Sequence, residues 1–398
     1  MQLFGYTTEG GLRRIAIDWM AKSIGFCRSG KRFVVRSLWF VTFFLMISVQ
    51  TQAQATNHWI NFNQQYFKIP ISKDGIYRIS YSDLQSANFP VNSVDPRLIQ
   101  LFHRGVEQAI FVQGEADAVF NTNDYIEFFG KRNDGTLDKK LYQPASAQLN
   151  PYYNLYSDTT AYFLTYRLSL PAAKRMDFFY EGNTTNIPQS TQHNEERWLL
   201  AANYYSSGFK QSDELENTFF DQGEGWVGQP LRQNESVDYV INGINNSAPG
   251  AGLPQLEMLV VGLDNFQHSG QVLVGNGLRN IANLNFTGYN KQLISVPLQW
   301  SDVGGDGTLT VRLSTGAATN NRLQMAVCYI KVTFPQHFNM VGSSEKYFYV
   351  NAGTTNQLNI EIENPATGLR MWDVTDANNV SIIGTYSKSG TIGAVLNN

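Results

Sequence analysis

Cys328 is the one thiol available for chemistry in this chain, because the other cysteine, Cys27, falls in a predicted leader. A cysteine nucleophile needs a neighbouring base and surroundings that favour the thiolate. The run 326–332 alternates so that Cys328 lies on an apolar face, and His337, in an expected loop after Pro335, has nothing to orient it toward the thiol. The residues expected to share that face are Ala326, Ile330, Val332 and Phe334. We therefore predict that Cys328 is a small core residue and not a nucleophile.

The five histidines are scattered along the sequence. They are His58, His103, His193, His268 and His337. None stands three or four residues from another, which excludes the helical zinc pattern of two spaced histidines. We expect His103 to be a partly exposed strand residue, and His193 to be solvated in a polar linker beside Glu195 and Glu196.

Three other signals are too weak to define a site. The segment 275–280 begins like a dinucleotide fingerprint but lacks the third glycine and a following helix, so it predicts a hairpin turn. An oxygen-rich segment could bind calcium, but a polar turn explains it equally well because the glycine of an EF-hand loop is missing. Its residues are Asp117, Asn121, Asn123, Asp124 and Glu127. Tyr204, Tyr205 and Trp226 could stack on a sugar, although packing at a sandwich edge is the favoured interpretation. We assign no catalytic, cofactor-binding or metal-binding residue.

The first 55 residues have the parts of a secretion leader. Residues 38–49 form an apolar run of 12, which suits a signal-peptide core and is shorter than the roughly 20 residues of a membrane-spanning helix. Basic residues at 31–36 precede this run, and Ala53-Gln54-Ala55 supplies a small-x-small cleavage site. We predict a signal peptide over 1–55, with Met20 as an alternative start. The mature chain is then expected in the periplasm, on the outer-membrane surface or outside the cell, without a transmembrane helix.

Composition limits what the mature chain can bind. The leader carries seven of the 30 basic and two of the 33 acidic residues, so the remaining 343 residues have a net charge near −8. Such a chain has no electrostatic reason to bind nucleic acid or an anionic membrane surface. A single mature cysteine allows no intramolecular disulfide, so the fold must rest on core burial.

The sequence after residue 55 predicts an all-β protein of three parts. Short strand-like runs separated by turn residues dominate, and one short helix is expected at 81–88 with Ser80 or Ser82 as its cap. A prodomain-like β domain is predicted at 56–185, with a hairpin at Asp74-Gly75. A polar linker at 182–194 leads to a jelly-roll-like antiparallel sandwich at 186–340. The predicted strands are 67–71, 76–79, 98–103, 109–113, 125–129, 162–168, 217–220, 237–241, 255–263, 271–274, 292–298, 309–313 and 323–334.

Residues 341–398 begin a third, small β unit that we expect to be incomplete. Strand-like runs occur at 346–350, 357–362, 370–374 and 380–385. A unit of about 60 residues without metal or disulfide is marginally stable by itself. The last run, 391–396, has no evident partner and is expected to be an exposed edge.

Several segments follow one another in a distinctive order: 74–79, 95–105, 123–130, 150–152, 155–159, 161–165 and 372–376. This order resembles the amino-terminal region of gingipain-type cysteine peptidases, closest to the type IX secretion sortases of Bacteroidetes. The last of these segments resembles the segment that precedes the catalytic domain of that family. Together they cover most of residues 60–385.

The resemblance implies that this chain is the non-catalytic portion of such a peptidase. The family's catalytic histidine and cysteine belong to an α/β domain that would begin beyond Asn398, and Cys328 does not fall in the nucleophile motif. The implied partners are that catalytic domain and the outer-membrane secretion components. The alternative is a free-standing surface module whose sandwich binds a glycan or a protein.

Overall fold

The computed structural model describes residues 57–210, 217–245, 247–248, 250, 252–318, 321–351 and 355–397, together with the backbone of residues 3–6. The chain divides into the unit Thr8–Gln64 and a second unit that holds the rest. The described part of the former contains one 3-10 turn, η1 (Asn57–Trp59). Most of the predicted leader therefore lies outside the described residues. Residues 3–6 form strand β1 (Leu3–Tyr6) in the larger unit.

The first β domain consists of two small sheets around one core. Their orders are β2-β8-β4-β5 and β3-β7-β6. The strands are β2 (Phe67–Ile71), β3 (Gly75–Ser80), β4 (Ile99–His103), β5 (Val106–Gln108), β6 (Phe111–Val112), β7 (Tyr125–Gly130) and β8 (Thr160–Tyr166). Buried apolar side chains from both sheets, including Leu101, Phe128 and Tyr162, form a single cluster. Of the run predicted at 109–113, only Phe111 and Val112 form a strand, β6, while Ile110 makes an isolated bridge with Arg175.

The predicted hairpin at Asp74-Gly75 is wrong. β2 pairs with β8 and β3 pairs with β7, so the two strands enter different sheets. A two-residue hairpin turn of type I′ needs positive φ at both central residues, and neither Asp74 nor Gly75 has it. The Asp74 carboxylate instead accepts a hydrogen bond from the Arg132 backbone at 2.7 Å. The helix prediction is confirmed. α2 (Tyr81–Ser86) begins directly after its N-cap residue, Ser80, which forms a capping box with Asp83.

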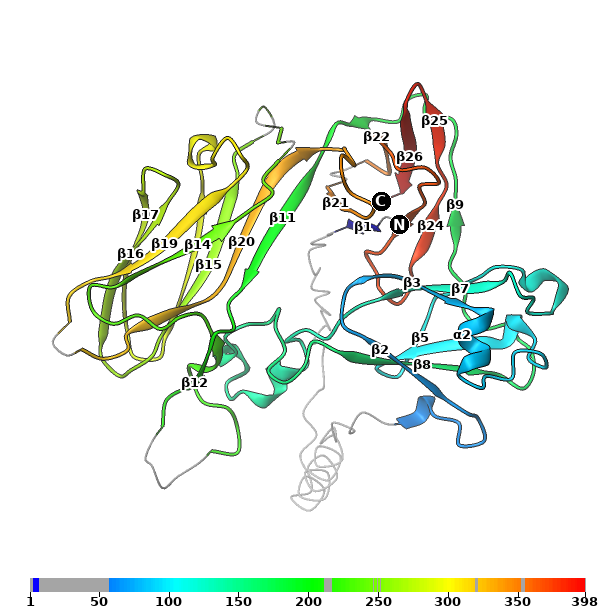
Figure 1. Cartoon of the computed structure of the whole chain (residues 1–398), viewed down its shortest axis with the longest axis horizontal. Helices are drawn as coiled ribbons and strands as arrows, with labels where there is room; N and C mark the ends of the chain where they lie inside the picture. Colours follow the sequence, from blue (N-terminus) through cyan, green and yellow to red (C-terminus); the bar gives the residue numbers. More distant parts are fainter. Residues whose placement is uncertain are drawn as a thin grey trace, which may run out of the picture. The chain divides into compact units, whose positions relative to one another are not determined.

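A two-layer antiparallel sandwich follows (Figure 1). One layer has the order β14-β19-β16-β17, and the other contains β18-β15-β20-β11. The strands are β11 (Gln192–Leu200), β14 (Ser236–Ile241), β15 (Gln255–Gly262), β16 (Gln267–Val274), β17 (Arg279–Thr287), β18 (Lys291–Pro297), β19 (Leu309–Thr315) and β20 (Met325–His337). Buried residues from both layers form one core, for example Val272, Leu313 and Ile330. The jelly-roll-like sandwich prediction agrees with this arrangement.

Two details of the sandwich differ from the expectation. β17 was not predicted, because its alternating polar residues resemble a loop. The stretch 217–220 contributes only an isolated bridge between Phe220 and Tyr142. Beside the sandwich, a two-stranded ribbon pairs β12 (Tyr204–Ser207) with β13 (Glu224–Val227).

The third part continues the β11 sheet and adds a second sheet over it. The continuation runs β11-β21-β1-β23-β24-β9, and the covering sheet has the order β10-β22-β26-β25. The strands are β9 (Phe178–Phe179), β10 (Gln189–Ser190), β21 (Tyr347–Val350), β22 (Gln357–Glu363), β23 (Met371–Asp373), β24 (Ser381–Ile383), β25 (Tyr386–Lys388) and β26 (Thr391–Asn397). A buried cluster that includes Phe348, Ile360 and Leu396 lies between the sheets.

The prediction that 391–396 is an exposed, unpartnered edge is wrong. β26 pairs with β22 on one side and with β25 on the other, so it is a central strand. Ala394, Val395 and Leu396 are buried. Local sequence patterns contain no sign of this pairing, because both partners lie in a sheet that forms only when the whole third part packs.

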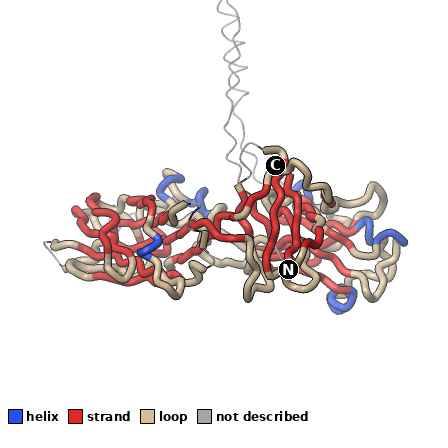
Figure 2. Tube along the Cα trace, turned by 90° about the horizontal axis from the view of Figure 1, so that it is seen from above, coloured by secondary structure: helices blue, strands red, loops and turns tan. Residues whose placement is uncertain are grey.

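The fold is nearly all β, as predicted from the sequence (Figure 2). The helical segments of the described part are short, and none of them is long and apolar enough to cross a membrane. Besides η1 and α2 they are the 3-10 turns η2 (Pro96–Leu98), η3 (Glu115–Asp117), η4 (Asp138–Leu141), η5 (Ala145–Ala147) and η7 (Trp300–Asp302).

The central position of β26 predicts a large effect of a charge placed there. Ala394 is fully buried, so Ala394→Asp would bury an unpaired carboxylate. We expect the free energy of unfolding to fall by about 3 kcal/mol or more. Ser387→Asp on the exposed strand β25 is the matched control and should change stability by less than about 0.5 kcal/mol. Chemical denaturation compares the variants, and an equally small effect of both would show that β26 is peripheral.

Candidate functional site

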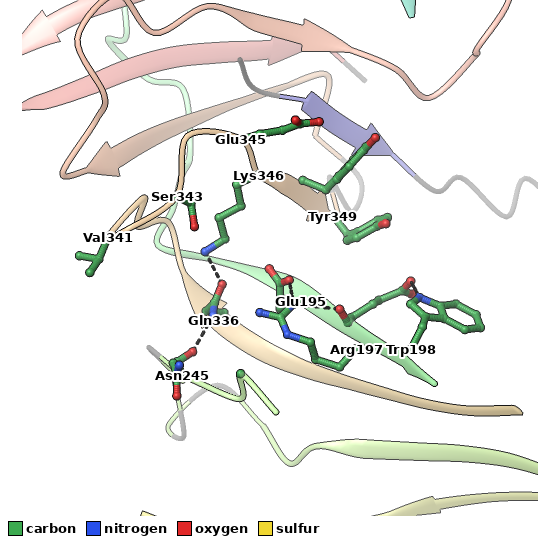
Figure 3. Close-up of a pocket in the computed structure, with 13 residues that line it drawn as sticks. Glu195, Arg197, Trp198, Asn245, Gln336, Val341, Ser343, Glu345, Lys346 and Tyr349 are labelled. Carbon is green, nitrogen blue, oxygen red and sulfur yellow. Dashed lines mark hydrogen bonds and ion pairs between the residues drawn. The ribbon is translucent and has the colours of Figure 1, made fainter. Parts of the chain in front are cut away.

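A polar cavity of about 440 Å³ lies where β11, β20 and β21 meet (Figure 3). Its walls come from both the sandwich and the third part of the fold. They include Glu195, Glu196, Arg197, Trp198, Asn245, Gln336, Ser343, Lys346 and Tyr349. Glu195 and Lys346, two ionisable groups whose pKa values are shifted by burial, line it, so we take it as the candidate functional site.

Strand alternation on β11 supplies one wall of the cavity. His193, Glu195 and Arg197 are two residues apart, so they project from the same face of the strand. β11 pairs with β20 along its whole length, which fixes the position of these side chains. On its other edge β11 pairs with β21 only at Asn194 and Tyr349. The cavity lies where this second pairing ends.

Glu195 is a buried carboxylate with only one of its oxygens satisfied. Its Oε1 pairs with the Arg197 guanidinium, which also donates a hydrogen bond to the Glu196 carbonyl at 3.0 Å. Its Oε2 has no hydrogen-bond partner and lies 3.9 Å from Nε2 of His193. Burial raises the pKa of Glu195, and the neighbouring Arg197 charge opposes that shift. The buried Oε2 of Glu195 is therefore left without a hydrogen-bond donor.

His193 is buried, which contradicts the prediction that it is solvated in a linker. Its ring contacts the rings of Phe338 and Phe348, at centroid distances of 5.3 and 4.8 Å. Nδ1 lies 3.0 Å from the Asn194 carbonyl oxygen, while Nε2 has no hydrogen-bond partner. Burial, and then the Lys346 charge, lower the pKa of His193 to about 3. The histidine is therefore neutral at physiological pH.

The opposite wall is joined to the sandwich by a chain of hydrogen bonds. The Lys346 ammonium donates to the Gln336 side chain and, at 2.8 Å, to the Asn339 carbonyl. Gln336 in turn donates to the carbonyl of Asn245 in the loop after β14. Figure 3 shows this line of contacts from Lys346 to Asn245. Burial lowers the pKa of Lys346, and Glu195 opposes that shift.

The cavity can bind polar groups but is not arranged for nucleophilic catalysis. A peptidase nucleophile must share a hydrogen bond with its base. Nε2 of His193 has no such partner, although Ser343 also lines the cavity. No group of three or more His, Cys, Asp or Glu side chains that could hold a metal ion occurs among the described residues.

Cys328 is a core residue, as predicted, but it lies on a different face from the one expected. It is fully buried, and burial raises the pKa of its thiol to about 12. The β15–β20 register shifts between Leu259 and Val260, leaving Cys328 as a bulged residue without a β15 partner. It therefore packs outside the sandwich, with Ala326 and Val261. The other expected neighbours, Ile330, Val332 and Phe334, lie inside the sandwich core.

The remaining histidines are separate from one another in the fold. His103 is buried, not partly exposed as predicted: its ring stacks on Tyr162 at 4.1 Å and burial lowers its pKa to about 4. His268 is also buried and lies 3.0 Å from the Gly288 carbonyl. His337 is exposed at the end of β20, not in a loop, nine residues and roughly 30 Å of strand from Cys328. His58 is in the turn η1.

The three weaker signals also have structural explanations. Residues 275–278 form the turn between β16 and β17, as predicted, with positive φ at Gly275 and Leu278. The oxygen-rich segment is not gathered into one site: Asp124 accepts from the Asn121 backbone at 2.6 Å, whereas Glu127 is buried against two arginines, Arg78 and Arg370.

The exposed aromatics belong to the β12–β13 ribbon. Tyr205 lies opposite Trp226, and their rings meet edge to face at 5.3 Å. Tyr205 donates to Glu224 at 2.9 Å, and the Trp226 indole donates to the Leu155 carbonyl at 2.9 Å. The rings of Tyr204 and Tyr205 remain partly exposed.

Sequence reasoning missed the cavity because 182–194 looked like a linker. Polar residues at 189–196 suggested a solvated segment, yet β10 and β11 include most of them. The available signal was the spacing of His193, Glu195 and Arg197 at the start of a strand whose later residues, Trp198 to Leu200, are apolar.

Comparisons with known proteins show a likeness in fold. No protein-family model and no curated protein matches the chain. Among solved structures, dimeric latent PorU from Porphyromonas gingivalis is similar over 84% of this chain, with 14% identity and a TM-score of 0.55. This chain spans 30% of the length of that protein. The CBM36-1 domain of a multidomain xylanase from the hindgut metagenome of Trinervitermes trinervoides matches 35% of this chain and 95% of its own, with 12% identity and a TM-score of 0.21. A family 35 carbohydrate-binding module from Cellvibrio japonicus matches 34% of this chain and 91% of its own, with 18% identity and a TM-score of 0.21.

We predict that the folded chain loses stability in acid and that this loss depends on the buried His193. Its pKa is about 3 in the folded protein and near 6.5 when unfolded, so the unfolded state binds more protons between these values. The stabilising contribution of neutral His193 is therefore present in full above pH 6.5 and is lost as the pH falls toward 3. Glu195 acts in the opposite direction, because its raised pKa lowers stability as the pH rises above its ordinary value.

The variant His193→Gln isolates the histidine contribution. Near pH 5 the free energy of unfolding of the original chain should change by about 1.3 kcal/mol per pH unit more steeply than that of the variant. Urea denaturation from pH 7 to pH 4 measures both slopes. His337→Gln, at an exposed position, is the control and should keep the original slope. Equal slopes for the original chain and His193→Gln would show that the ring is solvated.

Proposed function

We propose that this chain is the non-catalytic amino-terminal portion of an exported, gingipain-type cysteine peptidase of the type IX secretion sortase kind. The observation that carries the proposal is the likeness in fold to PorU over 84% of this chain, which is more than any one of its three parts. A shared sandwich alone would be weak support, since sandwiches serve many functions.

The described chemistry supports a role without catalysis in this portion. The one mature thiol is buried, and its raised pKa disfavours the thiolate that a nucleophile requires. Next to the candidate cavity, the buried ring of His193 has no hydroxyl or thiol bonded to its Nε2, which lies 3.9 Å from Glu195. Peptidase activity in the whole protein would then reside in a separate catalytic part.

The cavity has a structural role in this proposal. Lys346, Gln336 and Asn245 connect the third part to the sandwich through buried hydrogen bonds. Glu127, buried between Arg78 and Arg370, similarly connects the first domain to the third part. Breaking such a buried pair is costly because it leaves an uncompensated charge. The three parts would therefore present a fixed surface to the catalytic part and to outer-membrane secretion components.

Export follows from the proposal as well. We place the mature chain in the periplasm, on the outer-membrane surface or outside the cell, after removal of residues 1–55. The N-terminal mass of the protein recovered from the producing cells tests this step. A mass that begins at Thr56 supports it, and a protein that retains residues 1–55 contradicts it.

The purified chain is expected to have no peptidase activity and an unreactive thiol. Incubation with peptides containing Arg, Lys or a secretion-signal tail should yield no more product than the variant Cys328→Ala. A disulfide reagent should modify Cys328 at least about 100-fold more slowly in the folded chain than in denaturant. Hydrolysis that disappears in Cys328→Ala would overturn the proposal.

A free-standing surface binding module is the alternative function. The specific observation in its favour is the β12–β13 ribbon, where Tyr204 and Tyr205 keep exposed ring surface. Binding of the purified chain on a glycan array, lost in Tyr204→Ala with Tyr205→Ala, would favour this alternative. Val240→Ala, which removes an exposed apolar side chain on β14, is the control.

A further inference from the structure

β1 fills a strand position inside the extended sheet of the third part. It lies between β21 and β23 and runs parallel to both. Figure 1 shows it beside β21. Its four residues pair with Tyr347 to Val350 of β21, and Phe4 also pairs with Asp373 of β23. In the strand order of the described sheet β21 and β23 do not pair with each other, so β1 alone joins them. The position is one strand wide.

This strand position is interior, because both faces of the sheet around it are covered. On one face Phe348, Val350 and Met371 pack into the core beneath β22 and β26. On the other face Trp372 and Tyr347 pack with residues of the first domain, including Ile76. Parallel strands buried on both faces are apolar throughout. An occupant must therefore be extended, uncharged and able to pair by its backbone on both edges.

Two buried polar atoms beside the position lack hydrogen-bond partners. They are the indole nitrogen of Trp372 and the hydroxyl of Tyr347, which lie in the same cluster. Buried polar groups are normally satisfied, so each such atom indicates a missing partner.

We infer that, once the leader is removed, this position becomes a docking site for an extended, uncharged strand supplied by the catalytic part. The inference rests on the proposed function, since β1 lies within residues 1–55 and leaves with them. Without an occupant, the backbone groups of β21 and β23 that face the gap would be unpaired. Strand addition to such an edge uses main-chain hydrogen bonds for affinity and side-chain fit for specificity.

The geometry favours the catalytic part as the source of the strand. Leu396 of β26 belongs to the same buried cluster as Phe348 and Val350 of β21. A polypeptide that continues past Asn398 therefore starts beside the core that borders the gap. A linked segment binds at a high effective concentration, so even a weak four-residue strand would remain seated.

Hydrogen exchange on residues 56–398 tests the inference. This form keeps the core, because no described side chain before Phe67 belongs to the five buried clusters. The probe is a capped peptide with the sequence of residues 2–7. We expect the amides of Tyr347–Val350 and Met371–Asp373 to exchange rapidly without the peptide, and at least about tenfold more slowly with it at saturation. Amides of Arg279–Thr287, in the sandwich, should not change.

A second peptide with Phe4→Pro is the matched control. Proline lacks the backbone N–H and cannot pair on both edges, so this peptide should not slow exchange. Full protection of Tyr347–Val350 without peptide, no slowing with the first peptide, or equal slowing by both would each overturn the inference. Because the assay uses the purified form, its result is independent of cleavage in the cell and of peptidase activity, which test the proposed function.

Discussion

The long pairing of β11 with β20 is the constraint on which the rest of this structure depends. Nine residues of β11 pair with β20 in register, from Gln192 with His337 to Leu200 with Tyr329. These two strands complete one layer of the sandwich and also begin the sheet of the third part. The sandwich core, the candidate cavity and the third part therefore all depend on one register. A slip of one residue would move His193, Glu195 and Arg197 to the opposite face.

Buried charged groups occupy the junctions between the parts of the fold. Glu195 with Arg197, Lys346 with Gln336, and Glu127 with two arginines all lie where parts of the fold meet. Such pairs add little net stability, because desolvation offsets attraction. Their cost when broken is large, however, which favours one arrangement of the parts.

The strand position held by β1 and the pairing of β26 concern the same small core. The apolar cluster around Phe348 is covered by β22 and β26 on one side and is completed in the sheet by whatever lies between β21 and β23. A part of about 60 residues is close to the lower limit for an independent core. Its stability is therefore expected to depend on the strand that fills the gap.

The sequence by itself determined the β class, the helix at Ser80, most strands and the inert character of Cys328. These depend on local rules: residue alternation, capping chemistry, turn residues and the apolar neighbours of the thiol. Tertiary structure alone decided the pairing partners and the site. The Asp74-Gly75 turn separates two sheets, Cys328 moves to the outer face through a bulge, and β26 becomes a central strand. His193 changes from an expected solvated residue to a buried neutral one, because Phe338 and Phe348, about 150 residues away in sequence, enclose its ring. Burial arises from contacts between distant segments, and local sequence patterns contain no record of which segments will meet.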